Sequence, residues 1–151
     1  MTDDHQHGHC LCGAVSYELA KAPDGYGACH CGMCRRWSGG IELGIQVMPD
    51  DITWDGEDNI RTYRSSDWAE RGWCGACGSN LFWRLTASGP MQGLLALSAG
   101  SLDSLDGLRL TSEVYIDNKP AGHAFAGERT RMTEADVMAM VNAGDQGGTT
   151  P

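Results

Sequence analysis

Alternation between apolar and polar residues is the clearest pattern along this chain. Ile41, Leu43, Ile45 and Val47 alternate with polar or small residues, a period of two that is typical of a half-buried strand. Other apolar runs, bounded by turn-forming residues, predict further strands at residues 15–19, 52–54, 60–63, 80–85, 91–97 and 108–116. Many short strands joined by turns indicate a mostly β domain.

One segment near the C-terminus has the pattern of a helix. Thr133 and Asp136 have the spacing of a capping box. The apolar residues that follow fall on one helical face, and they are Val137, Met140 and Val141. Gly144 can end the helix. We therefore expect a single domain over residues 8–144 with one short C-terminal helix, between flexible tails at residues 1–7 and 145–151.

The charge of the chain excludes some classes of partner. Its 151 residues carry a net charge of −9 at pH 7. Nucleic acids and anionic membranes bind basic surfaces, so we expect neither as a partner. The chain has no apolar run near the roughly 18 residues that a membrane-spanning helix needs. Residues 1–10 lack the apolar stretch of a secretory signal, so a cytoplasmic protein is the expectation.

The seven cysteines give the strongest chemical signal. An odd number cannot all pair in disulfides, and clustered cysteines in the cytosol indicate metal or redox chemistry. They form three short clusters, which are Cys10-x-Cys12, Cys29-x-Cys31-x-x-Cys34 and Cys74-x-x-Cys77. A lone C-x-x-C pair also occurs in redox proteins. Three clusters together favour a metal, because each short loop presents several thiolates to one ion.

The spacing of the clusters divides the seven thiolates into four and three. Zinc takes about four ligands in a tetrahedron. The two cysteine pairs can together close a structural zinc site, and their members are Cys10, Cys12, Cys74 and Cys77. The remaining triad consists of Cys29, Cys31 and Cys34. It leaves one tetrahedral position open, as catalytic zinc sites do. The sequence therefore predicts two zinc ions per chain, one structural and one catalytic.

Histidines leave alternatives open at the triad. His30 or another histidine would close the triad as a fourth ligand, or the triad would stay reduced and hold no metal. In an extended C-x-C segment, however, the side chain of His30 points away from the metal. His5, His7 and His9 form a histidine-rich end of the kind that binds transition metals weakly. His123 is either a substrate contact or an exposed loop residue.

Four sequence motifs resemble those of a known family. The first two are Gly8-His9-Cys10-Leu11-Cys12-Gly13-Ala14-Val15 and Cys29-His30-Cys31-Gly32-Met33-Cys34-Arg35-Arg36, the latter followed by Ser38-Gly39. The other two are Trp73-Cys74-Gly75-Ala76-Cys77-Gly78-Ser79 and Ala99-Gly100-Ser101-Leu102-Asp103. In this order, the motifs resemble the family of glutathione-dependent formaldehyde-activating enzymes, which shares its domain with centromere protein V. The resemblance covers roughly residues 8–116.

The resemblance implies a fold, two metal sites and an activity. The fold is a zinc-containing tent of antiparallel β-sheets, like that of the Mss-four group of Rab-binding chaperones. The resemblance assigns the four-cysteine set to structural zinc and the triad to catalytic zinc. The implied activity is that of a carbon–sulfur lyase acting on a thiol–aldehyde adduct such as S-hydroxymethylglutathione, with glutathione and formaldehyde as the reacting partners. A non-catalytic zinc-binding module of the same fold is the alternative.

Two arginines are candidate substrate-binding residues, and one position departs from the family pattern. Arg35 and Arg36 directly follow the triad, and either can hold a substrate carboxylate through a bidentate contact. Surface salt bridges, or hydrogen bonds to the sulfurs, are the alternative roles. Members of the family often carry a His-Ile-type pair near the end of the last strand, where this chain has Glu113-Val114.

Overall fold

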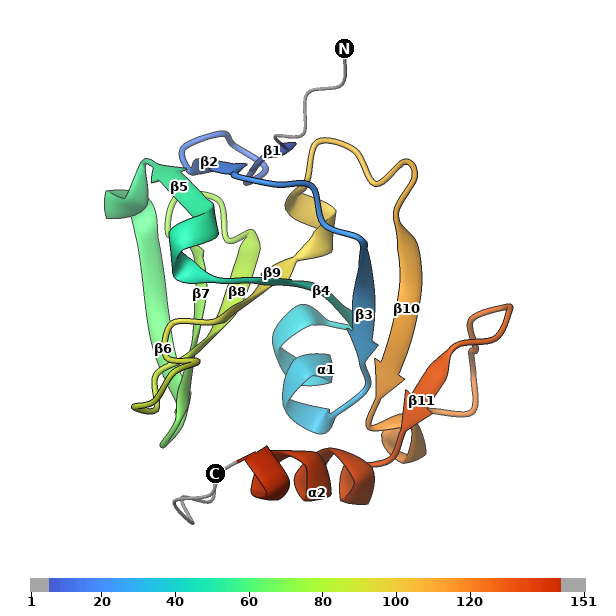
Figure 1. Cartoon of the computed structure of the whole chain (residues 1–151). Coiled ribbons are helices and arrows are strands. Elements are labelled where there is room, and N and C mark those ends of the chain that lie inside the picture. The colour runs from blue at the N-terminus through green and yellow to red at the C-terminus, as the bar shows by residue number, and fades with distance from the viewer. Residues whose placement is uncertain (1–5, 145–151) are drawn as a thin grey trace. The chain divides into compact units, whose positions relative to one another are not determined.

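The computed structural model describes residues 6–144, which form two compact units. Unit 1 consists of residues 6–24 and 44–108. Unit 2 consists of residues 25–43 and 109–144. Figure 1 shows the elements of both units in chain order by colour. Gln6 and His7, from the expected N-terminal tail, are part of a strand; the rest of both expected tails lies outside the described residues.

Unit 1 is built from antiparallel strands. One sheet has the order β1-β2-β5, with the strands β1 (Gln6–His9), β2 (Ser16–Leu19) and β5 (Ile52–Asp55). Further strands pair in the order β4-β9-β8-β7-β6, where β4 contributes its residues 44–47. Their bounds are β4 (Glu42–Val47), β6 (Ile60–Ser66), β7 (Ala69–Cys74), β8 (Asn80–Leu85) and β9 (Leu95–Ser98). Three 3-10 helices also lie in this unit: η1 (Pro49–Asp51) and η2 (Glu57–Asn59) connect strands, and η3 (Ala99–Ser101) follows β9.

Aromatic side chains pack the interior of unit 1. Tyr17 and Trp54 lie edge to face with ring centroids 5.4 Å apart. Trp54 in turn lies 5.7 Å from Phe82, which is fully buried on β8. The alternation predicted for residues 15–19 is confirmed, since Val15, Tyr17 and Leu19 are buried. This apolar interior fixes the ends of β1 and β7, from which two cysteine loops leave.

Unit 2 combines three strands with two helices. Its elements are β3 (Gly25–Cys29), α1 (Gly32–Ser38), β10 (Arg109–Val114), the 3-10 turn η4 (Ile116–Asn118), β11 (Thr130–Met132) and α2 (Glu134–Gly144). The strand order is β11-β10-β3, and both pairs are parallel. β3 and β10 run side by side in Figure 1. The expectation of antiparallel sheets is therefore wrong for unit 2. Its strands are joined by long connections rather than hairpins, so a parallel arrangement is available to them.

The C-terminal helix is confirmed, and a second helix was not predicted. Thr133 Oγ1 accepts a hydrogen bond from the Asp136 amide at 3.1 Å, and the Asp136 carboxylate accepts from the Thr133 amide at 2.9 Å. These two bonds form the capping box of α2. The unpredicted helix α1 lies within the cysteine triad, where its short length and few apolar residues give no helical period. Its N-terminus is capped by the sulfur of Cys31, a residue outside the usual set of N-caps.

The strand predictions succeed where alternation is clear. Strands were expected at the positions of β2, β4, β5, β6, β8 and β10, and they are present. The run at residues 91–97 becomes a strand only from Leu95, because a turn with a hydrogen bond from Gln92 N to Gly89 O precedes it. The strands β1, β3, β7 and β11 were not predicted. Among the described residues, no helix is long and apolar enough to cross a membrane.

Candidate metal centres

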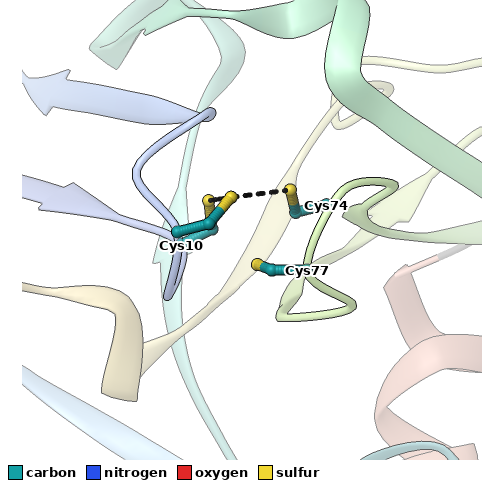
Figure 2. Close-up of side chains that lie close together, drawn as sticks. Cys10, Cys74 and Cys77 are labelled. Atoms are coloured by element: carbon teal, nitrogen blue, oxygen red, sulfur yellow. Dashed lines mark hydrogen bonds between the residues drawn. The ribbon is translucent and has the colours of Figure 1, made fainter.

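Four cysteines of unit 1 converge from two loops. Cys10 and Cys12 lie in the turn between β1 and β2, while Cys74 ends β7 and Cys77 lies in the turn before β8. All four sulfurs lie within 4.8 Å of one another. Figure 2 shows the sulfurs of Cys10, Cys74 and Cys77 facing a common space. The structure thus brings together the set predicted as structural ligands, and four thiols at this spacing form a donor set that suits zinc.

Hydrogen bonds within and between the two cysteine loops fix their conformation. The first loop turns back on itself through a bond from Gly13 N to Cys10 O at 3.1 Å, and the second through a bond from Gly78 N to Cys74 O at 2.7 Å. The Ser79 hydroxyl accepts a hydrogen bond from Leu11 N at 2.9 Å and lies 3.2 Å from the sulfur of Cys77. Ser79 therefore links the loops. Its hydrogen bond also lowers the pKa of the Cys77 thiol to about 5, because it stabilises the thiolate.

Three cysteines of unit 2 form the second group. Cys29 ends β3, Cys31 caps α1 and Cys34 lies in the first turn of α1, so a strand end and a helix start present all three sulfurs. The sulfurs lie within 4.8 Å of one another, and the group contains no fourth Cys, His, Asp or Glu from the described residues. The Cys34 amide donates a hydrogen bond to the Cys31 sulfur at 3.3 Å. This triad has the donor chemistry of a zinc site with three protein ligands.

The triad thiols share their protons unequally. Hydrogen bonds from Cys29 and from Cys34 lower the pKa of the Cys31 thiol to about 2. Hydrogen bonds with Cys31, which has the larger effect, and with Cys34 raise the pKa of the Cys29 thiol far above its usual range. One thiolate is thus stabilised by two thiols. A bound dication would replace those two protons, because metal ligands must be deprotonated.

His30 is turned toward another partner. Its Nε2 lies 2.8 Å from Glu113 Oε1, and both side chains are buried. Its Nδ1 is buried and has no hydrogen-bond partner among the described residues. As expected for an extended C-x-C segment, the imidazole is not part of the group of sulfurs.

The other candidate residues lie at the surface. Arg35 and Arg36 are exposed on α1, and within the part of the chain that the structure describes neither guanidinium makes an ion pair or hydrogen bond. His123 is exposed, with its ring centroid 6.2 Å from that of His30. His9 Nε2 lies 3.5 Å from Asp103 Oδ1, while His5 lies outside the described residues.

Sequence reasoning missed the charged cluster around Glu113. Its Oε2 accepts hydrogen bonds from Arg129 at 2.8 Å and from Arg131 at 3.1 Å. Burial would raise the pKa of Glu113, but the hydrogen bonds from His30 and the two arginines lower it overall. The signal available in the sequence was the departure from the family pattern at this position. It did not reveal the partners, which come from other segments.

Tyr115 was also missed. It is the one non-glycine residue with positive φ, 56°, among the described residues. It follows β10 directly, and its hydroxyl lies 3.9 Å from the sulfur of Met138 on α2. A left-handed backbone at a non-glycine residue is uncommon, and the surrounding structure must stabilise it.

The chain is similar to known proteins over most of its length. A model of the family described as glutathione-dependent formaldehyde-activating enzyme matches residues 5–118, more than half of the chain. A protein of Schizosaccharomyces pombe named an uncharacterized lyase is 26% identical over 134 residues, which cover 89% of this chain and 95% of the yeast protein. Both cysteine groups lie within the residues matched by the family model. The chain therefore belongs to the family of glutathione-dependent formaldehyde-activating enzymes.

Proposed function

We propose that this chain is a zinc-dependent carbon–sulfur lyase that acts on the adduct of a small thiol with an aldehyde, of the S-hydroxymethylglutathione type. The observation that carries the proposal is the triad of Cys29, Cys31 and Cys34, whose sulfurs form a ligand set of three. A purely structural zinc site is closed by four ligands, whereas a set of three leaves a place for a substrate. Membership in the family and the name lyase of the yeast relative support the same activity.

The proposed reaction balances without an external oxidant or reductant. In the adduct, one carbon carries both the thioether sulfur and a hydroxyl group. The carbon–sulfur bond breaks, the hydroxyl proton is released and its oxygen becomes the aldehyde carbonyl. The sulfur leaves with the bonding electron pair and takes up a proton as the free thiol. The reverse reaction joins the thiol and the aldehyde.

The triad residues hold the metal in this proposal. Zinc bound there would stabilise a substrate sulfur as thiolate and act as a Lewis acid. Three thiolate ligands give the zinc a formally negative set of ligands, which favours capture of a thiol over strong polarisation of a carbonyl. Because β3 fixes Cys29 and α1 fixes Cys31 and Cys34, the ligand sulfurs are held by rigid elements rather than by a loose loop.

Arg35 is the better placed of the two candidate substrate-binding arginines. Arg35 lies one helical turn after Cys31, and its backbone N donates a hydrogen bond to Cys31 O at 2.9 Å. Residues four apart on a helix lie on the same face, so Arg35 shares a face with Cys31. Arg36 lies about 100° further round the helix. The Arg35 guanidinium is exposed, which leaves it available to a carboxylate of a glutathione-like thiol. A cytoplasmic location and the Mss-four-like architecture belong to the same proposal.

Metal content measured together with the response to a thiol tests the function. We expect about two zinc ions per chain, as the two ligand sets require. Addition of glutathione should change the X-ray absorption spectrum of zinc in a way consistent with one new sulfur ligand at one of the two ions. The purified chain should also release formaldehyde from S-hydroxymethylglutathione faster than the uncatalysed reaction. One tightly held zinc ion without a response to glutathione would instead indicate a non-catalytic zinc-binding module.

A further inference from the structure

Glu113 is the centre of a buried charged network in unit 2. Its side chain is 2% exposed, and the side chain of His30 is fully buried. One carboxylate oxygen contacts His30 Nε2 at 2.8 Å, while the other accepts from Arg129 and Arg131 at 2.8 and 3.1 Å. Both carboxylate oxygens are therefore engaged, and the two arginines fix the direction in which Oε1 meets the imidazole.

Stability alone is a weak explanation for this network. Removing charged groups from water costs free energy that their attraction often only just offsets, and apolar residues of similar size frequently stabilise a protein as well. Both oxygens of the Glu113 carboxylate are hydrogen-bonded, however, and these bonds restrict the orientation of the carboxylate and of the imidazole that it contacts. The position of His30 in the sequence suggests what that orientation serves, since its two neighbours are Cys29 and Cys31.

The strand β10 holds His30 at two points. Val114 is the partner of Cys29 in the parallel pair of β10 and β3, and Val114 O accepts a hydrogen bond from His30 N at 3.1 Å. Glu113, the residue before Val114, binds the imidazole. Side chains of successive residues in an extended segment point to opposite sides. Anchoring the His30 ring on one side therefore determines where the sulfurs of Cys29 and Cys31 lie on the other.

We propose that Glu113 is a positioning residue for the triad, acting through His30. Arg129 and Arg131 hold the Glu113 carboxylate, Glu113 holds the His30 imidazole, and the fixed His30 orients Cys29 and Cys31 toward a common metal. The inference rests on the proposed function only in that the triad must bind a metal. Residues that orient metal ligands typically change metal affinity by about 10- to 100-fold when they are substituted.

Cobalt binding tests the proposal without an activity assay. Co²⁺ bound by thiolates has intense charge-transfer bands, and competition with a chelator gives the affinity of each ion. The ion that is missing in Cys31→Ser identifies the signal of the triad. We expect Glu113→Gln to weaken binding of that ion by about 10- to 100-fold and to alter its visible bands, while the ion of the four-cysteine group is unchanged.

Glu128→Gln provides the matched control. It makes the same change of charge and side-chain type, and Glu128 also contacts Arg131, at 3.1 Å, but its side chain is 95% exposed. This control should leave cobalt affinity at the triad within about twofold of the original chain, because exposed ion pairs contribute little. An equal loss in both variants would overturn the proposal, since a general electrostatic effect would then explain it.

A double variant separates positioning through His30 from a merely structural role. If Glu113 acts through His30, Glu113→Gln should weaken cobalt binding much less in a His30→Asn background than in the original chain. Equal losses in the two backgrounds would overturn the proposal. If Glu113→Gln does not fold, Arg131→Gln takes its place, because it removes one of the two donors to Oε2 and leaves Arg129. It should give a smaller loss in the same direction, and unchanged affinity would contradict the inference.

The outcomes distinguish this inference from the proposed function. Two cobalt ions per chain with equal triad affinity in the original chain and in Glu113→Gln would overturn the positioning role alone. A chain in which the triad takes up no metal would overturn both proposals.

Discussion

The sulfur of Cys12 lies 3.8 Å from the sulfur of Cys74, although 62 residues separate them in the sequence. The contact joins the turn after β1 to the end of β7, and Cys10 and Cys77 complete the group. A metal bound there would connect two loops that are held together otherwise by a few hydrogen bonds. The four-cysteine group and the triad should therefore differ in their importance for folding.

Substitution of one cysteine in each group tests this difference. Cys74→Ser should lower the free energy of unfolding by more than about 4 kcal/mol, because the binding energy of structural zinc is folding energy. Cys31→Ser should cost about 1 kcal/mol or less and remove one metal ion, since serine is itself a good N-cap for α1. Thermal unfolding followed by circular dichroism, with metal analysis of each variant, gives the comparison. A larger loss of stability in Cys31→Ser would show that the roles of the two groups are wrongly assigned.

Stepwise removal of metal should separate the two sites in a second way. A chelator should take the triad ion first, because three protein ligands hold an ion less completely than four. Loss of this first ion should leave the circular dichroism spectrum nearly unchanged, and loss of the second should unfold unit 1. Metal release followed with a zinc indicator dye during the titration measures the order. Simultaneous release of both ions would contradict the assignment of separate roles.

Arg35 and Arg36 give a matched pair for substrate binding. Arg35→Gln should raise KM for S-hydroxymethylglutathione about tenfold, because one charge-assisted contact to a carboxylate is lost. Arg36→Gln should change KM by less than about twofold, because Arg36 lies about 100° further round α1 than Arg35. Steady-state kinetics of formaldehyde release measure both. If both variants change KM to the same extent, the position of each arginine around α1 does not determine which one binds the substrate.

Gly8 is predicted to tolerate no side chain. A Cβ atom at this position would overlap the hydroxyl of Tyr17 and the backbone oxygen of Ser101, and Tyr17 is itself buried. Gly8→Ala should cost about 1–3 kcal/mol, the range for overpacking. Gly40→Ala is the control: a Cβ there meets nothing within 4 Å, so the change should stay within about 0.5 kcal/mol. Chemical denaturation of the two variants tests the pair, and equal stabilities would argue against the close packing of β1.

Local patterns explain which parts of the fold were predictable. Strand β2 was predicted because Tyr17 and Leu19 alternate with polar residues, and α2 because Thr133 and Asp136 cap it. Strand β3 carries two glycines and no alternation, so its sequence contains no strand signal. Its extended conformation comes from pairing with β10, which lies far away in the sequence.

Glu113 shows why the charged network could not be predicted. In an alternating strand a glutamate is ordinarily placed on the solvent side, yet Glu113 is buried. Burial becomes tolerable because His30, Arg129 and Arg131 supply donors to its two oxygens. Those donors come from two segments, residue 30 and residues 129–131, and no sequence spacing relates either segment to Glu113.

The division of the cysteines follows from the sequence alone, because short spacings place several thiols on one loop whatever the rest of the chain does. The sequence also indicates the mostly β character and the C-terminal helix, which depend on local period and capping. The folded chain was needed to show that the loops of Cys10 and Cys74 meet, that the strands of unit 2 are parallel, and that His30 faces Glu113. These features depend on contacts between segments distant in sequence, whose free energy arises from packing and burial that no local pattern records.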